Sequence, residues 1–291
     1  MSCYTSVVKE EKTIEKGEFE FRKFQFDFVS GIVESQASRA LETKVHYSKQ
    51  MQFDAKTVDK ELMKELWSVD DASVILHTSE GNLRLPKGNQ AFDGLKDIRC
   101  IREVESEREL ANIHGTFYEL PLIHVGQEPL FKMMRPVSSH NYYIDDYNTW
   151  NGLLVLSGIK RTAKLSNSIC MNSEKTAGLW FGSIDDLWKL GKPVGYGGPW
   201  MNTAVKAGKL SDPYLMTGYD KKTLTLKADC DVKVTLSISV SHYLKESVIY
   251  KVFDLQAGQE FKYVFPEGFS AHWAYLSTDK DCTATAQFIY E

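Results

Sequence analysis

The segment KTLTLKADCDVKVTLSISV, residues 222–240, contains two strand-like runs joined by a polar turn, and it decides the fold of the C-terminal part. Apolar and polar residues alternate in both runs, which is typical of β-strands with one buried face. Short strands at spacings of about 8 to 12 residues, with no helical stretch between them, predict an antiparallel β-sandwich for residues 213–291. Six such runs follow one another there, at 222–228, 232–240, 248–255, 261–265, 272–277 and 283–290.

The segment FPEGFSAHW, residues 265–273, places aromatic residues on both sides of a Pro-Glu-Gly turn. Phe, Tyr and Trp make up 12% of the whole chain, and such side chains bury large apolar areas in the cores of sheets. We therefore expect Phe265, Phe269 and Trp273 to lie in or beside the core of the sandwich.

Residues 1–212 also contain strand-like runs, of which FEFRKFQFDF at 19–28 is the most regular. Four further apolar runs lie at 73–77, 114–120, 150–158 and 176–182. Their centres are 42, 36 and 26 residues apart. Propeller blades recur at about 40 to 50 residues, so two of the three intervals favour blades and one is short. We expect a partial or small β-propeller-like region here.

Two other segments complete the expected organisation. The run TVDKELMKELW at 57–67 has apolar residues at helical spacing and acidic residues in its first turn, so it predicts a short connecting helix. Between residues 191 and 213 the chain is rich in Gly and Pro, which predicts a linker or a wrapped connection. The predicted fold class is thus all-β, with a propeller-like region at 1–212 followed by an antiparallel β-sandwich at 213–291.

A β-branched residue followed by two aspartates recurs three times, each time near a tryptophan: Val69-Asp70-Asp71, Ile144-Asp145-Asp146 and Ile184-Asp185-Asp186. Asp pairs after a strand are common turn formers, because their carboxylates accept hydrogen bonds from nearby backbone N–H groups. This interpretation is favoured. The alternative places acidic pairs from several blades around one central mouth, where they would bind a cation or act as acid and base.

The composition argues against several classes of function. A formal net charge of −4 argues against nonspecific nucleic-acid binding. The five cysteines are scattered and form no CxxC or CxH pair, so neither a zinc site nor a disulfide framework is expected. Cys230 and Cys282 both fall in the predicted sandwich and could meet across two strands, where two buried thiols are favoured over a disulfide. The chain also lacks nucleotide-binding, P-loop and HExxH motifs, so no metal and no cofactor is expected.

The sequence has no stretch that predicts a membrane span, which needs about 18 apolar residues. Its first 16 residues lack the apolar run and cleavage site of an export signal. The cytoplasm is therefore the default location, unless the chain is a fragment of an exported protein and Met1 is an internal start.

Several segments resemble an uncharacterised family of bacterial proteins, namely SIDDLWKLGKPVGYGGPW at 183–200, SDPYLMTGYDKKTLTL at 211–226 and HGTFYELP at 114–121. Members of that family look like β-propellers followed by a small β-sandwich, and they are often longer than this chain. If the longer members are the complete form, this chain holds only the last blades and the sandwich. The family has no established activity, so the resemblance implies no catalytic residue. Turns at 78–82 and 172–176 bear a weaker likeness to the Asp-box hairpins of sialidase-type propellers.

The candidate catalytic residues are those expected at the strand ends of successive blades: Glu34, His114, His140 and Asp185. Such strand ends meet around one channel in a propeller, so we expect these four residues to converge on one opening. Single histidines in turns are more often structural hydrogen-bonding groups, and that interpretation is favoured for both histidines. The candidate binding residues are Arg39, which can hold a carboxylate through two hydrogen bonds, and Trp150, Trp180 and Trp188.

Two hypotheses of function follow. The first is a carbohydrate-active or carbohydrate-binding protein, with glycoside hydrolase-like activity if it is an enzyme. Two carboxyl groups about 5 to 10 Å apart in a concave site would favour it. The second is a noncatalytic protein-interaction or scaffold module, favoured if the acids are dispersed on outer turns. The expected partners are a carbohydrate ligand, and either a partner chain or missing N-terminal blades that cover an exposed sheet edge.

Overall fold

A computed structural model of the chain describes residues 67–78, 81–92, 99–104, 108–120, 131–142, 144, 147–150, 152–159, 168–171, 178–241, 244 and 246–291. The strand predicted at 19–28 lies outside these residues, and so do residues 57–66 of the predicted helix. The last residue predicted for that helix, Trp67, begins a strand instead. The chain divides into two compact units. The first comprises Met1–Met63, Lys96–Ile113 and His140–Leu190, and the second comprises Lys64–Leu95, His114–Ser139 and Gly191–Glu291.

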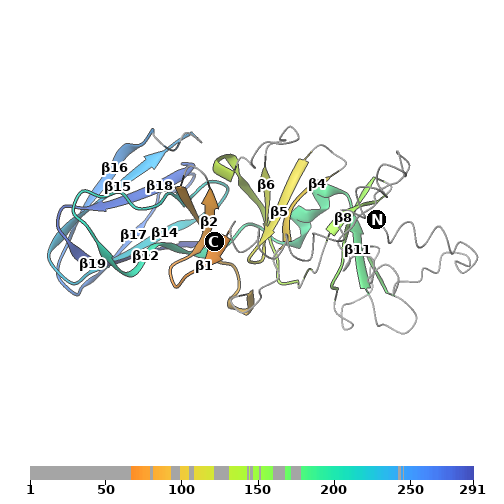
Figure 1. Cartoon of the computed structure of the whole chain (residues 1–291), viewed down its shortest axis with the longest axis horizontal. Coiled ribbons are helices and arrows are strands. Elements are labelled where there is room, and N and C mark those ends of the chain that lie inside the picture. Colours follow the sequence, from red (N-terminus) through yellow and green to blue (C-terminus); the bar gives the residue numbers. More distant parts are fainter. Residues whose placement is uncertain are drawn as a thin grey trace, which may run out of the picture. The chain divides into compact units, whose positions relative to one another are not determined.

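The second unit is built on two sheets that form two layers (Figure 1). The first layer has seven strands in the order β1 (Trp67–Val69), β2 (Val74–Thr78), β3 (Gly81–Leu85), β13 (Tyr214–Leu215), β18 (Trp273–Thr278), β15 (Val232–Ser239) and β16 (Val248–Leu255). The second layer has four strands in the order β12 (Gly195–Val205), β19 (Cys282–Tyr290), β14 (Lys222–Ala228) and β17 (Glu260–Val264). The unit also contains the hairpin of β6 (Thr116–Leu120) and β7 (Arg135–Ser139), with the short 3₁₀ helices η2 (Gln90–Phe92) and η3 (Phe131–Met133).

Alternating side chains explain how these layers pack. In β14, Leu224 and Leu226 are buried, and Thr225 between them lies on the other face. Aromatic rings fill the space between the layers, as in the contact of Phe253 of β16 with Tyr263 of β17, whose ring centroids are 5.2 Å apart. The six strands predicted in residues 222–290 are confirmed to within a residue or so at their ends, and so is the antiparallel sandwich.

The predicted linker at 191–213 is wrong, because eleven of its residues form strand β12. This strand pairs with β19 from Gly195 to Val205, with register shifts on both sides of Trp200. Gly198 makes the pairing possible, since a Cβ at this position would overlap the backbone oxygen of Ala286. The glycines that resemble a linker in the sequence therefore allow a bulged strand to approach β19 closely.

The seven-stranded sheet also includes residues from the part of the sequence where we expected propeller blades. Tyr214 of β13 pairs in parallel with Arg84 of β3, and β3 continues the sheet to β2 and β1. The sandwich in this unit thus includes strands on both sides of residue 212. The division into domains at 1–212 and 213–291 itself stays a prediction.

The first unit contains the four-stranded sheet β10-β11-β9-β8 and the antiparallel strand pair β4–β5. Its strands are β4 (Arg99–Val104), β5 (Arg108–Ile113), β8 (Tyr147–Trp150), β9 (Leu153–Leu156), β10 (Ile169–Met171) and β11 (Gly178–Gly182), followed by the 3₁₀ helix η4 (Ile184–Leu190). The single strand predicted at 150–158 is a hairpin instead, because the chain turns at Gly152, where φ is 78°.

The all-β fold class is confirmed, since the described elements are strands and short 3₁₀ helices. Each sheet of the described residues has a linear strand order with two ends. No described sheet closes on itself, so the propeller-like arrangement is not confirmed.

Candidate functional site

His114 lies in the turn before β6, where it is buried and has a φ of 51°. Its Nδ1 accepts a hydrogen bond from the backbone N–H of Gly88 at 3.0 Å. The two segments lie so close that a Cβ at Gly88 would overlap the carbonyl oxygen of His114. The imidazole of His114 therefore holds the segment that follows β3, which is the structural role favoured from the sequence.

His140 follows β7 in the sequence and is also buried. Its Nδ1 accepts a hydrogen bond from the backbone N–H of Tyr142 at 3.2 Å, so the ring proton is on Nε2. Nε2 donates that proton to Oδ1 of Asn112 at 2.9 Å. Burial lowers the pKa of His140 from 6.5 to about 4, so the ring is neutral at neutral pH. Both ring nitrogens thus have structural partners.

Asp185 and Asp186 belong to the first turn of η4. Oδ2 of Asp186 accepts the backbone N–H of Ser183 at 2.8 Å, and Oδ1 accepts Nζ of Lys189 at 2.6 Å. The hydrogen bond from Lys189, followed by that from Ser183, lowers the pKa of Asp186. Asp186 therefore caps a helix, as expected for a turn former, while Asp185 is exposed.

The three tryptophans proposed for ligand binding have different environments within the first unit. Trp150 is half-buried and packs its edge against Phe181, with ring centroids 6.2 Å apart. Trp180 is buried, and a Cβ at Gly182 would overlap its ring. Trp188 of η4 is 68% exposed. Of these three, only Trp188 presents an aromatic face on which a ligand could stack.

The expected convergence of the four candidate catalytic residues stays a prediction. Glu34 lies outside the described residues, as do the binding candidate Arg39 and the second Asp pair at 145–146. His114 belongs to the second unit, whereas His140 and Asp185 belong to the first. The two histidines are thus explained by their own local structure, and Asp185 is an exposed residue of η4.

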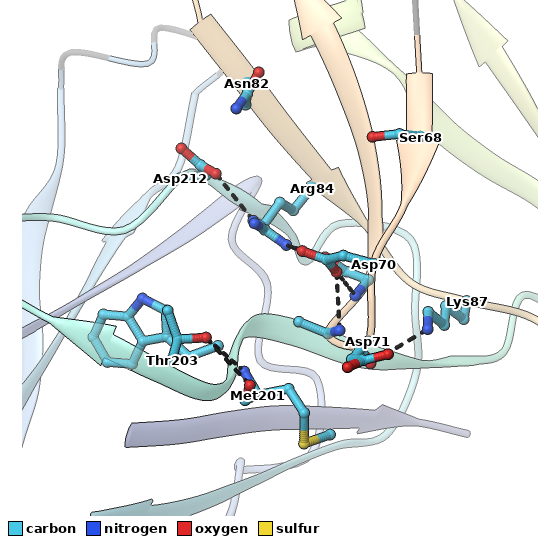
Figure 2. A network of polar contacts seen from close by, with 12 residues as sticks. Ser68, Asp70, Asp71, Asn82, Arg84, Lys87, Met201, Thr203 and Asp212 are labelled. Carbon is cyan, nitrogen blue, oxygen red and sulfur yellow. Dashed lines mark hydrogen bonds and ion pairs between the residues drawn. The ribbon is translucent and has the colours of Figure 1, made fainter. Parts of the chain in front are cut away.

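Figure 2 shows Arg84 between Asp70 and Asp212, in a polar network that the sequence did not indicate. Nη1 of Arg84 lies 2.8 Å from Asp70 Oδ2 and 2.9 Å from Ser73 Oγ, and its Nε lies 3.0 Å from Asp212 Oδ2. Oδ1 of Asp70 accepts the backbone N–H groups of Ala72 and Ser73 at 2.9 and 2.7 Å. Asp70 is therefore a turn former, and the network holds the β1–β2 turn, β3 and the segment before β13 together.

A cluster of three potential metal ligands lies at one end of the sandwich, where none was expected. One ligand atom each from Asp229, Cys230 and Cys282 lies within 4.8 Å of the others. Both cysteines are free thiols, as favoured from the sequence, and they are half-buried rather than buried. Burial, together with the neighbouring Cys230 and Asp229, raises the pKa of Cys282 to about 11. The meeting of these two cysteines, considered from the sequence, is thus confirmed, and the new feature is the carboxylate of Asp229 beside them.

The sandwich also presents an apolar surface, which we call the β16–β17 edge. β16 and β17 are each the last strand of their sheet. They lie side by side, because the hydroxyls of Tyr250 and Tyr263 are 2.9 Å apart. The edge consists of the exposed side chains of Val248, Ile249, Val252, Phe261 and Val264. A signal for it exists in the sequence, since VIYKVF at 248–253 is apolar on both strand faces.

Comparison with protein-family models and with curated proteins finds no match to this chain. In the part of the chain that the structure describes, no helix is both long and apolar enough to cross a membrane.

Proposed function

We propose that this chain is a noncatalytic interaction module whose β16–β17 edge binds an extended segment of a partner protein. The observation that carries the proposal is the set of exposed apolar side chains on β16, a strand with only one neighbour among the described strands. The open backbone groups of an edge strand can pair with another chain, and an extended peptide that does so adds a strand to the sheet. Exposed apolar side chains beside them would supply binding energy.

The charges of β16 do little to protect this edge. Sheet edges are commonly protected by lysines that project into solvent. Here, Nζ of Lys251 lies over the ring of Tyr263, 4.5 Å from its centroid, and Lys233 contacts Asp254 at 3.5 Å. Both charged side chains of β16 thus have partners within the sandwich. The apolar residues Val248 and Ile249 remain for an incoming chain.

The described catalytic candidates support the same proposal. Nδ1 of His114 and both ring nitrogens of His140 make structural hydrogen bonds. Among the aspartates of the recurring Asp pairs, Asp70 and Asp186 hold turns. Acids dispersed on separate turns favour the interaction module over a hydrolase, for which two facing carboxyl groups are needed.

Selection from a random peptide library displayed on phage tests the proposal, with counter-selection against the Ile249→Lys variant. We expect extended apolar peptides that bind the wild-type chain and slow hydrogen exchange of the β16 amides. Ile249→Lys should weaken their binding at least tenfold, or about 1.4 kcal/mol. The matched control is Leu210→Lys, since Leu210 is also an exposed apolar residue but lies off the edge. Equal effects of the two substitutions would refute the proposed surface.

Carbohydrate binding is the second candidate function, and the exposed ring of Trp188 favours it. Flat aromatic faces stack on sugar rings, and Asp185 on the same short helix could accept hydrogen bonds from sugar hydroxyls. A glycan array should then give binding that Trp188→Ala abolishes. A panel of chromogenic glycosides provides the test of catalysis, and hydrolysis by the pure chain would contradict the noncatalytic proposal. Membership of the uncharacterised bacterial family likewise stays a proposal, based on the segments quoted above.

A further inference from the structure

The pairing of β14 with β19 places Cys230 opposite Cys282. Ala228 pairs with Ala284 at the end of the regular ladder, and the same register continued by two residues brings the two cysteines together. The residue between them confirms the continuation, because the backbone N–H of Asp229 donates to the carbonyl oxygen of Thr283 at 3.1 Å. The β14–β15 turn and the first residue of β19 thus contribute to one cluster.

We propose that Asp229, Cys230 and Cys282 form a binding site for a divalent cation of borderline softness, Zn²⁺ by preference. Two sulfur atoms on a tetrahedral Zn²⁺ are about 3.8 Å apart, given bonds of about 2.3 Å to each. The ligand atoms here lie within 4.8 Å of one another, so small side-chain rotations bring them to bonding geometry. The fourth ligand is water, because Asp229 is exposed and leaves the site open to solvent.

The chemistry of the three groups selects this class of cation. Thiolate sulfur favours Zn²⁺ and Cd²⁺ over Mg²⁺ and Ca²⁺, which take oxygen ligands. Each thiol transfers its proton to solvent when its sulfur binds the cation. The resulting two thiolates and one carboxylate carry three negative charges, which a divalent cation partly neutralises.

The carboxylate is held in position before any cation binds. Oδ1 of Asp229 accepts the backbone N–H of Thr283 at 2.9 Å, and the other carboxylate oxygen is the proposed ligand. Bound Zn²⁺ would tie the β14–β15 turn to β19, and a cation that binds only the folded chain stabilises the fold. The proposed cation site contains none of the residues of the β16–β17 edge, so it does not depend on the proposed function of that edge.

Titration of the fully reduced full-length chain with Cd²⁺ tests the proposal, because thiolate–cadmium bonds have an ultraviolet charge-transfer band. We expect one equivalent to produce the band and Zn²⁺ to displace the Cd²⁺. Cys230→Ser and Cys282→Ser should each weaken binding at least tenfold, whereas Cys170→Ser, which removes an exposed thiol in the first unit, should leave it unchanged. Asp229→Asn keeps the oxygen that caps Thr283, so it should weaken binding while the band remains.

Two results would overturn the site. One is a band that persists unchanged in Cys230→Ser and Cys282→Ser, which would assign the cation to other cysteines. The other is the absence of any band in wild-type chain whose thiols are all reduced. Should the serine variants fail to fold, alkylation of the wild-type chain followed by mass spectrometry shows which cysteines bind Zn²⁺. Zn²⁺ should protect Cys230 and Cys282 but not Cys170, and equal alkylation with and without Zn²⁺ at the first two would refute the proposal.

Discussion

The ring of Tyr214 stacks on the ring of Phe288, with centroids 5.0 Å apart and planes at 15°. Tyr214 belongs to the seven-stranded sheet and Phe288 to the four-stranded sheet, so the contact joins the two layers of the sandwich. Both residues are fully buried. Tyr290, which also contacts Tyr214, donates its hydroxyl to the carbonyl oxygen of Leu215 at 2.9 Å. The core thus combines ring packing with a hydrogen bond across the layers.

Replacement of Trp273 by Ala should strongly destabilise the sandwich. Trp273 is fully buried, and its Nε1 donates to the carbonyl oxygen of Lys132 at 3.0 Å. We expect a loss of about 3 to 5 kcal/mol in the free energy of unfolding, measured with urea. Trp188→Ala is the matched control, since this exposed ring should contribute less than about 0.5 kcal/mol. Similar urea midpoints for the two variants would contradict the core position of Trp273.

Two substitutions at Asp70 should separate its turn from its ion pair with Arg84. Asp70→Asn keeps an oxygen for the N–H groups of Ala72 and Ser73, and should cost about 1 kcal/mol. Asp70→Ala removes the turn hydrogen bonds as well and should cost about 2 to 3 kcal/mol. Asp71→Ala, at the exposed neighbour, serves as the control and should have little effect. Equal losses for the two Asp70 variants would show that the turn hydrogen bonds contribute nothing to stability.

His140 should make stability depend on pH. Its pKa falls from 6.5 to about 4 on folding, so the unfolded chain binds more protons between these values. The contribution of neutral His140 to the free energy of unfolding is complete above pH 6.5 and is lost as the pH falls toward 4. The total loss is up to about 3 kcal/mol. Urea midpoints across this range should fall less steeply in His140→Gln than in the wild-type chain. Parallel curves for the two proteins would exclude His140 as the source.

Strand β12 should stabilise the sandwich without being required for its folding. We predict that residues 213–291 fold alone with a cooperative thermal transition, and that residues 191–291 are more stable. The longer fragment retains β12, which covers the edge of β19 and buries Trp200. Burial of one large side chain contributes about 1.5 to 3 kcal/mol. Thermal melting monitored by circular dichroism compares the fragments, and a random-coil spectrum for 213–291 would refute its independent folding.

Several expectations from the sequence were correct because they depend on neighbouring residues. The strands between residues 222 and 290 follow from the alternation of apolar and polar residues, and their turns follow from Asp, Gly and Pro. Phe265 and Trp273 are buried, and Phe269 packs beside the core with its ring 5.0 Å from that of Phe265, as the segment 265–273 indicated. Asp70 and Asp186 hold turns, which is the commoner role of such residues.

Other features arise between segments that are distant in the sequence, so local patterns could not reveal them. Gly198 belongs to a strand only because β19 lies beside it. Without knowledge of that neighbour, a glycine-rich segment predicts a linker. Arg84 meets Asp212 because β3 pairs with β13, which joins residues far apart in the chain.

The sequence by itself thus determined the all-β class, the strands of the sandwich and the aromatic residues of its core, because alternation and turn chemistry act over a few residues. Only the tertiary structure decided which strands are neighbours, which edge is open and which thiols meet. These depend on the register and order of strands, and each is set by the packing of the whole unit.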